Sequence, residues 1–346
     1  MATIKEIAKK SGVSPGTVSN VLNGKRPVAE ATRKKVMQVI SEMNYQPDYF
    51  AQGLRQRKSN LIGIIAEEIV QFSTPPIVEG IMSLCEKQGY RIILEDLRFY
   101  SRWGVNRKEK EESFLTAQNF AFQRMMSLNV DGIVYIGAHM REIQNIPHDL
   151  KVPLVIAFGR DTDCALPNVI INDEKGGYDV TKYLISLGHR KIGIIGGLLS
   201  NEHAQRRVLG YQKALFEYSL PYNPSWVRYG GWDIEDGYRE IEPLLLEQVS
   251  AVFCLNDFVA GGVYKYLNEH GLVVGRDLSV VGFDNRSMTE CFCPALTTVK
   301  IPLGNIGESA AKLILECIAE EKLPTDAGTQ QLSCTLVERQ SVARLR

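Results

Sequence analysis

From Asn60 onward, short apolar runs alternate with segments of helical periodicity. Seven of these runs are typical of strands, at 61–66, 91–95, 132–137, 153–158, 191–197, 251–255 and 278–283. Helical patterns fit between them, at 76–88, 113–128, 174–187, 203–218, 235–247, 257–270 and 303–320. Apolar strands separated by helices indicate parallel sheets that are covered on both faces. These strand-and-helix units are too many for a single sheet. We therefore predict an α/β body of two doubly wound lobes with a ligand cleft between them.

The first 45 residues follow a different pattern, which predicts three short helices. Thr3 is expected to cap a helix over 4–10 in a capping box, and the Ser11-Gly12 pair to end it. Ser14 is a favourable N-cap for a second helix, and a third is expected over 30–43. A helix, a tight turn and a capped second helix together predict a helix-turn-helix.

The charge of the chain is zero overall but unevenly distributed. The first 60 residues hold 11 Lys and Arg against four Asp and Glu, and the remainder hold 29 against 36. A basic head on an acidic body favours a head that meets a polyanion such as nucleic acid. The chain has no apolar run near the ~20 residues that span a bilayer, and it starts without a signal peptide, so we expect a cytoplasmic protein without membrane contact.

Enzyme and metal signatures are missing from the sequence. It contains no G-x-S-x-G elbow, P-loop, G-x-G-x-x-G or H-E-x-x-H motif, and its five histidines form no pattern. Cys291 and Cys293 have no second pair at zinc-site spacing, and most of the seven cysteines lie in apolar runs as expected of buried thiols. We therefore expect no enzyme activity, no metal and no cofactor. A sugar-binding transport protein would explain the body but not the basic head.

The ordered motifs SPGTVSNVLNG, GFDN and PALTTV resemble the lac repressor/galactose repressor family, and the likeness covers nearly the whole chain. The resemblance implies a helix-turn-helix DNA-binding domain over 1–46 and a hinge helix or linker over 47–59. It also implies a two-lobed, periplasmic-binding-protein-like domain for effector binding and dimerisation over 60–341. The implied protein is a homodimeric repressor of carbohydrate-utilisation genes that binds a near-palindromic operator in double-stranded DNA.

The recognition helix presents its N-terminal residues to base edges in the major groove. Asn20 can contact adenine through two hydrogen bonds, and Gly16 lets the backbone approach closely. Thr17 and Ser19 are unusual inside a helix unless they serve DNA, whereas Arg26 is either a base contact or a solvated loop residue. The predicted DNA-binding residues are Thr3, Ser14, Gly16, Thr17, Ser19, Asn20, Asn23, Arg26, Tyr45, Leu54 and Arg55.

Residues 48–55 resemble the family's hinge helix, which folds on DNA, pairs with its dimer mate and drives a leucine into the minor groove. Leu54 occupies that place, with Arg55 beside it. So short a segment, with Gly53 inside, cannot hold a helix alone in water. Gln52 departs from the arginine that is usual in the family. The resemblance implies a central CG step in the operator.

Arg207, Trp232, Asn256 and Asp284 resemble the family's ligand contacts. Polar side chains can hold sugar hydroxyls, and an indole can cover the apolar face of a sugar ring. Each residue also has a structural alternative: a loop cap for Asp284, a helix N-cap for Asn256, a core position for Trp232 and a surface charge for Arg207.

Phe158 and Arg160, at the end of one strand, could also reach this cleft. The stretch QFST before two prolines departs from the family, and segment 98–112 is expected to be a solvated loop that leads into a helix. These departures leave the effector open: a sugar is expected, and a nucleobase, a phosphorylated metabolite or a protein co-repressor is the alternative. Release of DNA on effector binding rests on analogy alone.

Overall fold

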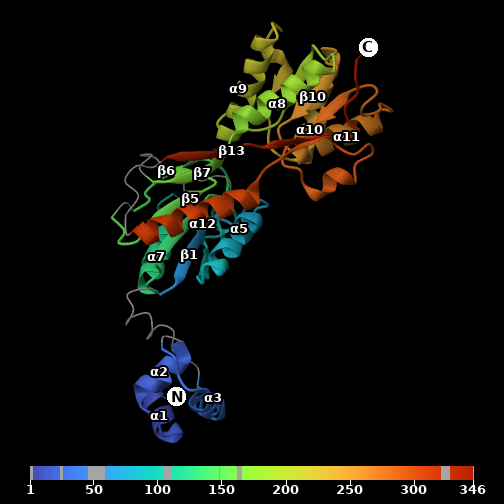
Figure 1. Cartoon of the computed structure of the whole chain (residues 1–346). Coiled ribbons are helices and arrows are strands. Elements are labelled where there is room, and N and C mark those ends of the chain that lie inside the picture. The colour runs from blue at the N-terminus through green and yellow to red at the C-terminus, as the bar shows by residue number, and fades with distance from the viewer. Residues whose placement is uncertain are drawn as a thin grey trace. The chain divides into compact units, whose positions relative to one another are not determined.

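The computed structural model describes residues 3–23, 26–45, 59–104, 111–147, 149–161, 166–320 and 328–345. The chain divides into two compact units, Met1–Ser59 and Asn60–Arg346, which we call the head and the body (Figure 1). No helix in the described part of the chain is long and apolar enough to cross a membrane.

The head consists of three helices, α1 (Ile4–Ser11), α2 (Pro15–Asn23) and α3 (Glu30–Glu42). The capping box is confirmed, because Thr3 Oγ1 accepts the Glu6 N–H at 3.3 Å and the Glu6 carboxylate accepts the Thr3 N–H at 2.7 Å. Gly12 ends α1 in the left-handed conformation, with φ of 64°. The three helices share a small core of Ile7, Ala8, Val18, Val21, Val36 and Val39.

The first lobe of the body is built on a six-stranded parallel sheet in the order β13-β7-β5-β3-β1-β2 (Figure 1). Its strands are β1 (Leu61–Ala66), β2 (Arg91–Asp96), β3 (Gly132–Ile136), β5 (Leu154–Ala157), β7 (Asn168–Ile171) and β13 (Thr329–Leu332). Its helices are α5 (Thr74–Lys87), α6 (Phe99–Trp103), α7 (Glu111–Ser127) and α12 (Leu303–Glu320). Helices α5 and α12 share one core with the sheet, and α7 packs with a second core that contains Phe114 and Met125.

The second lobe has a four-stranded parallel sheet in the order β11-β10-β8-β9. Its strands are β8 (Ile192–Ile195), β9 (Val227–Arg228), β10 (Ala251–Cys254) and β11 (Ser279–Val281). Its helices are α8 (Asp173–Ser186), α9 (Glu202–Glu217), α10 (Ile234–Leu246) and α11 (Asp257–Glu269), with short 3-10 turns at Pro224–Trp226 and Ser287–Glu290. The predicted fold class, an all-α head followed by two doubly wound lobes, is confirmed.

The chain passes between the lobes three times. It crosses from β7 into α8, returns through β12 (Thr298–Lys300) into α12, and crosses again through β14 (Thr335–Val337). Strands β12 and β14 pair antiparallel at this connection. A further short pair, β4 (Glu142–Ile143) and β6 (Arg160–Asp161), lies in the first lobe.

Close helix packing in the second lobe depends on glycines. A Cβ on Gly177 of α8 would lie 2.2 Å from the Arg207 carbonyl oxygen, and one on Gly210 of α9 would lie 2.0 Å from the Glu174 carbonyl oxygen. Real Cβ atoms do not approach backbone so closely, so the α8–α9 distance exists only because both positions lack a side chain. Position 207, a predicted effector contact, is thereby held against α8.

Segment 98–112 corrects one prediction, because its first residues form helix α6 instead of a solvated loop. Phe99 is buried and meets Phe114 edge-on at 5.0 Å between ring centroids. The Glu68 carboxylate accepts the N–H groups of Tyr100 at 2.7 Å and Ser101 at 3.1 Å, so it caps the helix from the end of β1. A helix of five residues capped by a distant carboxylate leaves no periodic signal in its own sequence.

Candidate DNA interface and effector cleft

Helix α2 has one buried face and one polar face. Val18 and Val21 enter the head core, with 0% and 7% of their surface exposed. The opposite side carries predicted DNA-binding residues that are exposed or half-exposed: Ser14, Gly16, Thr17, Ser19 and Asn20. An amphipathic helix with a polar face of small side chains fits the groove-reading role of a recognition helix.

Local hydrogen bonds already engage some of these groups. Ser14 Oγ accepts the Thr17 N–H at 3.1 Å and lies 3.0 Å from the Thr17 hydroxyl, as expected of an N-cap. The Thr3 hydroxyl belongs to the α1 capping box, and Tyr45 packs against the head core. Arg26 is exposed. Three further predicted contacts lie outside the described parts of the chain: the side chain of Asn23, and Leu54 and Arg55.

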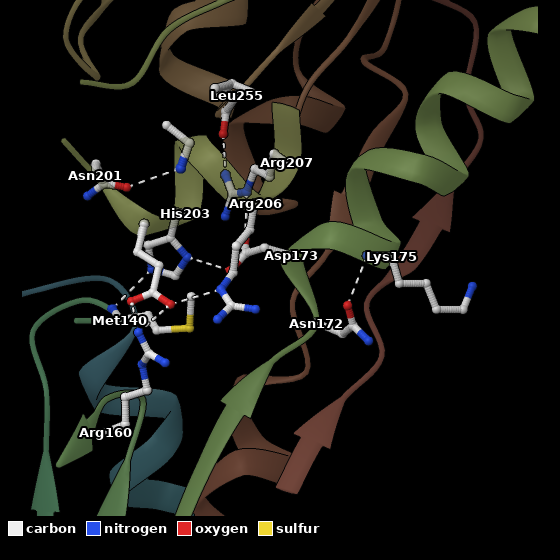
Figure 2. Close-up of polar contacts among 12 residues, drawn as sticks. Met140, Arg160, Asn172, Asp173, Lys175, Asn201, His203, Arg206, Arg207 and Leu255 are labelled. Atoms are coloured by element: carbon white, nitrogen blue, oxygen red, sulfur yellow. Dashed lines mark hydrogen bonds and ion pairs between the residues drawn. The ribbon is translucent and has the colours of Figure 1, made fainter. Parts of the chain in front are cut away.

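Arg207, a predicted effector contact, is a highly connected residue of the candidate cleft. It projects from α9, is only 3% exposed, and donates through Nε to Asp173 at 2.7 Å and through Nη1 to the Leu255 carbonyl (Figure 2). Its guanidinium lies 3.6 Å from the ring centroid of Phe283, the residue before Asp284. The surface-charge alternative is therefore wrong for Arg207, which joins the ends of three chain segments.

A second chain of contacts leads from Asp173 to the first lobe. His203 Nδ1 lies 2.7 Å from the Asp173 carboxylate, and His203 Nε2 accepts the Met140 backbone N–H at 3.1 Å (Figure 2). Beside it, Arg160 of the first lobe lies 2.9 Å from the carboxylate of Glu202 at the start of α9. These contacts join the two lobes along one edge of the cleft.

Asp173 is a buried carboxylate held ionised by its neighbours. Burial alone would raise its pKa, but the charges and hydrogen bonds of His203 and Arg207 hold the pKa below its ordinary value. It therefore serves as a fixed negative centre that orients both side chains. Neither Asp173 nor His203 was among the residues predicted from the sequence.

Asp284 and Asp257, which follow β11 and β10, are two interacting carboxyl groups whose pKa values shift in the direction opposite to that of Asp173. Burial and the Asp284 charge raise the pKa of Asp257 to about 7, although Thr298 and Arg286 oppose the shift. Burial also raises the pKa of Asp284, against the charges of Arg207 and Arg286. Asp284 has a φ of 108°, an uncommon conformation for a residue with a side chain. A buried, strained carboxylate at a strand end is the kind of group that a polar ligand would satisfy.

Trp232 and Asn256 lie together beside these groups. Asn256 Oδ1 accepts the Val259 N–H at 2.8 Å, so it is the N-cap of α11, the structural alternative weighed above. Its Nδ2 donates to the Trp232 carbonyl at 2.9 Å, which ties the Trp232 loop to the strand end. Trp232 is half-buried. Phe158 is buried with φ of 58°, and its ring lies 5.4 Å from that of His203.

Two hollows flank this cluster. One, of about 740 Å³, is lined by His139, Arg160, Glu202 and Arg206, among others. The other, of about 650 Å³, is lined by Phe72, Phe258, Asp284 and Arg286, among others. The sequence reasoning missed Phe72, Phe258 and Arg286. Phe72 lies in the QFST stretch, whose departure from the family pattern was the available signal.

No group of three or more potential metal-ligating side chains occurs in the described residues. Cys85, Cys254 and Cys334 are buried, whereas Cys291 and Cys293 are exposed. Burial raises the pKa of the Cys85 thiol to about 11 and that of Cys334 to about 12, so both are ordinary core thiols.

A helix-turn-helix head attached to a two-lobed parallel-sheet body defines a class of DNA-binding regulators. Residues 3–48 match the model of bacterial regulatory proteins of the lacI family, and residues 181–342 match a periplasmic binding protein-like domain. The chain is 33% identical over 349 residues to the ribose operon repressor of Haemophilus influenzae, and the match covers 100% of both. It is 32% identical to the HTH-type transcriptional repressor PurR of Vibrio campbellii, over 93% of both.

Among solved structures, a lac repressor dimer bound to operator and the anti-inducer ONPF matches with a TM-score of 0.79 and 26% identity, covering 99% of each chain. The chain belongs to the lacI family of bacterial regulatory proteins. It is a DNA-binding transcriptional repressor, as the resemblance implied, and its family is one of regulators and not of enzymes.

Proposed function

We propose that this protein represses carbohydrate-utilisation genes as a homodimer and that a sugar-like effector, bound between the lobes, controls it. The observation that carries the proposal is the convergence of Arg207, Asp284 and the Trp232 loop at the strand ends of the second lobe. The similarity to a ribose operon repressor along the full length of both chains supports a sugar. The nearly equal identity to PurR repressors keeps the nucleobase class among the effectors to be tested.

The chemistry of these groups suits a neutral polyol. Asp284 accepts hydrogen bonds from hydroxyl groups, and the Arg207 guanidinium donates to them. The half-buried indole of Trp232 offers an apolar face to ring C–H groups. A strongly anionic effector is disfavoured, because Asp284 and Asp257 would oppose it and Arg207 is already paired with Asp173.

DNA recognition is assigned to the polar face of α2 in the major groove and to Leu54 in the minor groove. Each chain carries one helix-turn-helix, so two chains are needed to bind both halves of a near-palindromic operator. The similar lac repressor structure is a dimer bound to operator. Because the target is genomic DNA, the protein works in the cytoplasm. Closure of the lobes on the effector changes the spacing of the two heads of the dimer. DNA is released to the extent that the effector binds the closed arrangement more tightly than the arrangement that binds DNA.

The test uses the full-length chain. Operators are selected from a random DNA pool, and a thermal-shift screen then compares sugars, sugar phosphates and nucleobases. A sugar that stabilises the protein and weakens binding to the selected operator supports the proposal. A chain lacking residues 1–58 and an Asn20→Ala variant serve as controls for specific DNA binding. Stabilisation by nucleobases alone, or a stable monomer at micromolar concentration in sedimentation, would contradict it.

A further inference from the structure

The guanidinium of Arg286 lies between two aromatic rings. Its central carbon is 4.0 Å from the ring centroid of Phe72 and 4.2 Å from that of Phe258. Phe72 precedes α5 in the first lobe, whereas Phe258 belongs to α11 in the second. One side chain therefore fills a slot with a wall from each lobe, at the edge of the 650 Å³ hollow.

The backbone of Arg286 is fixed by a short hydrogen bond, whereas in the described structure its guanidinium makes only a long one besides its contacts with the two rings. The Arg286 N–H donates to the Asp257 carboxylate at 2.7 Å, which fixes the start of the loop. Within the described part of the chain, the guanidinium donates only to Asp284, and at 3.4 Å, which is long for a charge-assisted hydrogen bond. The side chain can therefore leave the slot without disturbing its own backbone.

The slot offers what a sugar ring requires. Two aromatic faces can cover the apolar faces of a ring, and Asp284 at its side can accept hydrogen bonds from hydroxyls. Arg286 uses the same features, because a guanidinium stacks on aromatic faces and pairs with a carboxylate. Two occupants with the same requirements cannot share the slot.

We propose that Arg286 is an internal occupant of the effector cleft, and that an effector must displace its guanidinium from between Phe72 and Phe258 in order to bind. The inference rests on the proposed function for the identity of the effector site. Without effector, the Arg286 guanidinium lies 3.4 Å from the Asp284 carboxylate and adds its charge to that of Arg207. Effector affinity is then reduced by the fraction of molecules in which Arg286 occupies the slot.

The first experiment measures D-ribose binding by calorimetry to the full-length wild type and to Arg286→Ala. Removal of the competitor should tighten binding at least tenfold. Arg276→Ala is the matched control, because Arg276 is an exposed arginine of the same lobe paired with Asp277. A merely structural role for Arg286 predicts weaker binding in Arg286→Ala, together with a lower melting temperature.

The second experiment uses methylguanidinium as a probe of the slot and does not depend on the effector. It should stabilise Arg286→Ala against heat but not the wild type, and neutral methylurea should stabilise neither. The double variant Phe72→Ala, Arg286→Ala should lose this rescue, because one wall of the slot is then missing.

The outcomes separate the two hypotheses. If the wild type binds ribose and a folded Arg286→Ala binds it no more tightly, the displacement inference is overturned while the proposed function stands. If no sugar binds either protein, the proposed effector class fails, and methylguanidinium rescue alone decides whether Arg286 occupies a slot. Absence of that rescue in folded Arg286→Ala overturns the inference whatever the effector is.

Discussion

The backbone N–H of Met140, in the first lobe, donates a hydrogen bond of 3.1 Å to Nε2 of His203 in the second (Figure 2). On the other side of the same ring, Nδ1 lies 2.7 Å from the buried Asp173 carboxylate. One imidazole ring therefore connects the start of α8 in the second lobe to the backbone of the first lobe.

His203→Ala should open the unliganded body. The substitution removes the acceptor for Met140 and one partner of the buried Asp173 carboxylate, at a cost of about 1–3 kcal/mol. We expect a larger radius of gyration in solution scattering and a lower melting temperature. His270→Ala is the control, because His270 bonds only within its own lobe in the described structure. An unchanged radius of gyration would show that the contact does not hold the lobes together.

The buried Asp257 carboxyl should make stability depend on pH. Its pKa is raised to about 7 in the folded chain by burial and by Asp284, against about 4 when unfolded. A raised pKa means that the folded state binds the proton more tightly, so this contribution is complete below pH 4 and is lost as the pH rises through 7. Unfolding free energy should therefore fall between pH 5 and 7, by up to about 1.4 kcal/mol per pH unit.

Asp257→Asn should flatten that dependence, because the amide cannot titrate. Chemical denaturation at several pH values measures it. Asp277→Asn is the control: hydrogen bonding to Arg276 lowers the pKa of Asp277, so its titration lies below this window. Equal slopes in Asp257→Asn and wild type would exclude Asp257 as the source.

Gly210→Ala should destabilise the second lobe strongly. The new methyl would lie 2.0 Å from the Glu174 carbonyl oxygen and 2.6 Å from the Tyr178 nitrogen, so α8 and α9 must separate. Overpacking of this kind costs about 1–3 kcal/mol or more. Gly304→Ala is the control, because a Cβ at Gly304 meets no atom within 4 Å and the residue has no positive φ. Gly89→Ala would be less suitable, because the φ of 78° at Gly89 strains any residue with a side chain. Similar melting temperatures for Gly210→Ala and Gly304→Ala would refute the packing argument.

Regular elements could be predicted from the sequence because their signal is local. The periodic stretch 303–320 coincides with α12, and the fully apolar run 61–66 coincides with β1. Strand β13 was missed, because TQQL carries no apolar pattern and joins the sheet as a polar edge strand from the far end of the chain. Strand β7 was missed as well.

The candidate site was predictable only in part, for a related reason. Arg207 and Asp284 lie in motifs that could be recognised, whereas the partners of Arg207 come from distant segments. A lone histidine in a helix gives no indication that it accepts a hydrogen bond from another lobe, as His203 does. Likewise, the rings on either side of Arg286 are 186 positions apart in sequence, at Phe72 and Phe258.

Leu54→Ala should reduce affinity for the operator far more than affinity for random DNA. The resemblance assigns Leu54 to a minor-groove wedge at a central CG step, and unstacking that step belongs to specific binding alone. Phosphate contacts, which dominate non-specific binding, are unchanged. Fluorescence anisotropy with both DNAs at one salt concentration measures the two losses. Equal losses on operator and random DNA would contradict the wedge.

Asp284→Ala should abolish the effector response while operator binding without effector persists. Asp284 is buried in the body, beside Arg286 at 3.4 Å, and the predicted DNA-binding residues all belong to the head. Removing the carboxylate removes the acceptor for effector hydroxyls, a loss of about 1.5–3 kcal/mol or roughly 10- to 150-fold in affinity. Operator binding is titrated with D-ribose in wild type, Asp284→Ala and Asp277→Ala, an exposed carboxylate of the same lobe. A response of Asp284→Ala at wild-type ribose concentrations would show that the effector binds elsewhere.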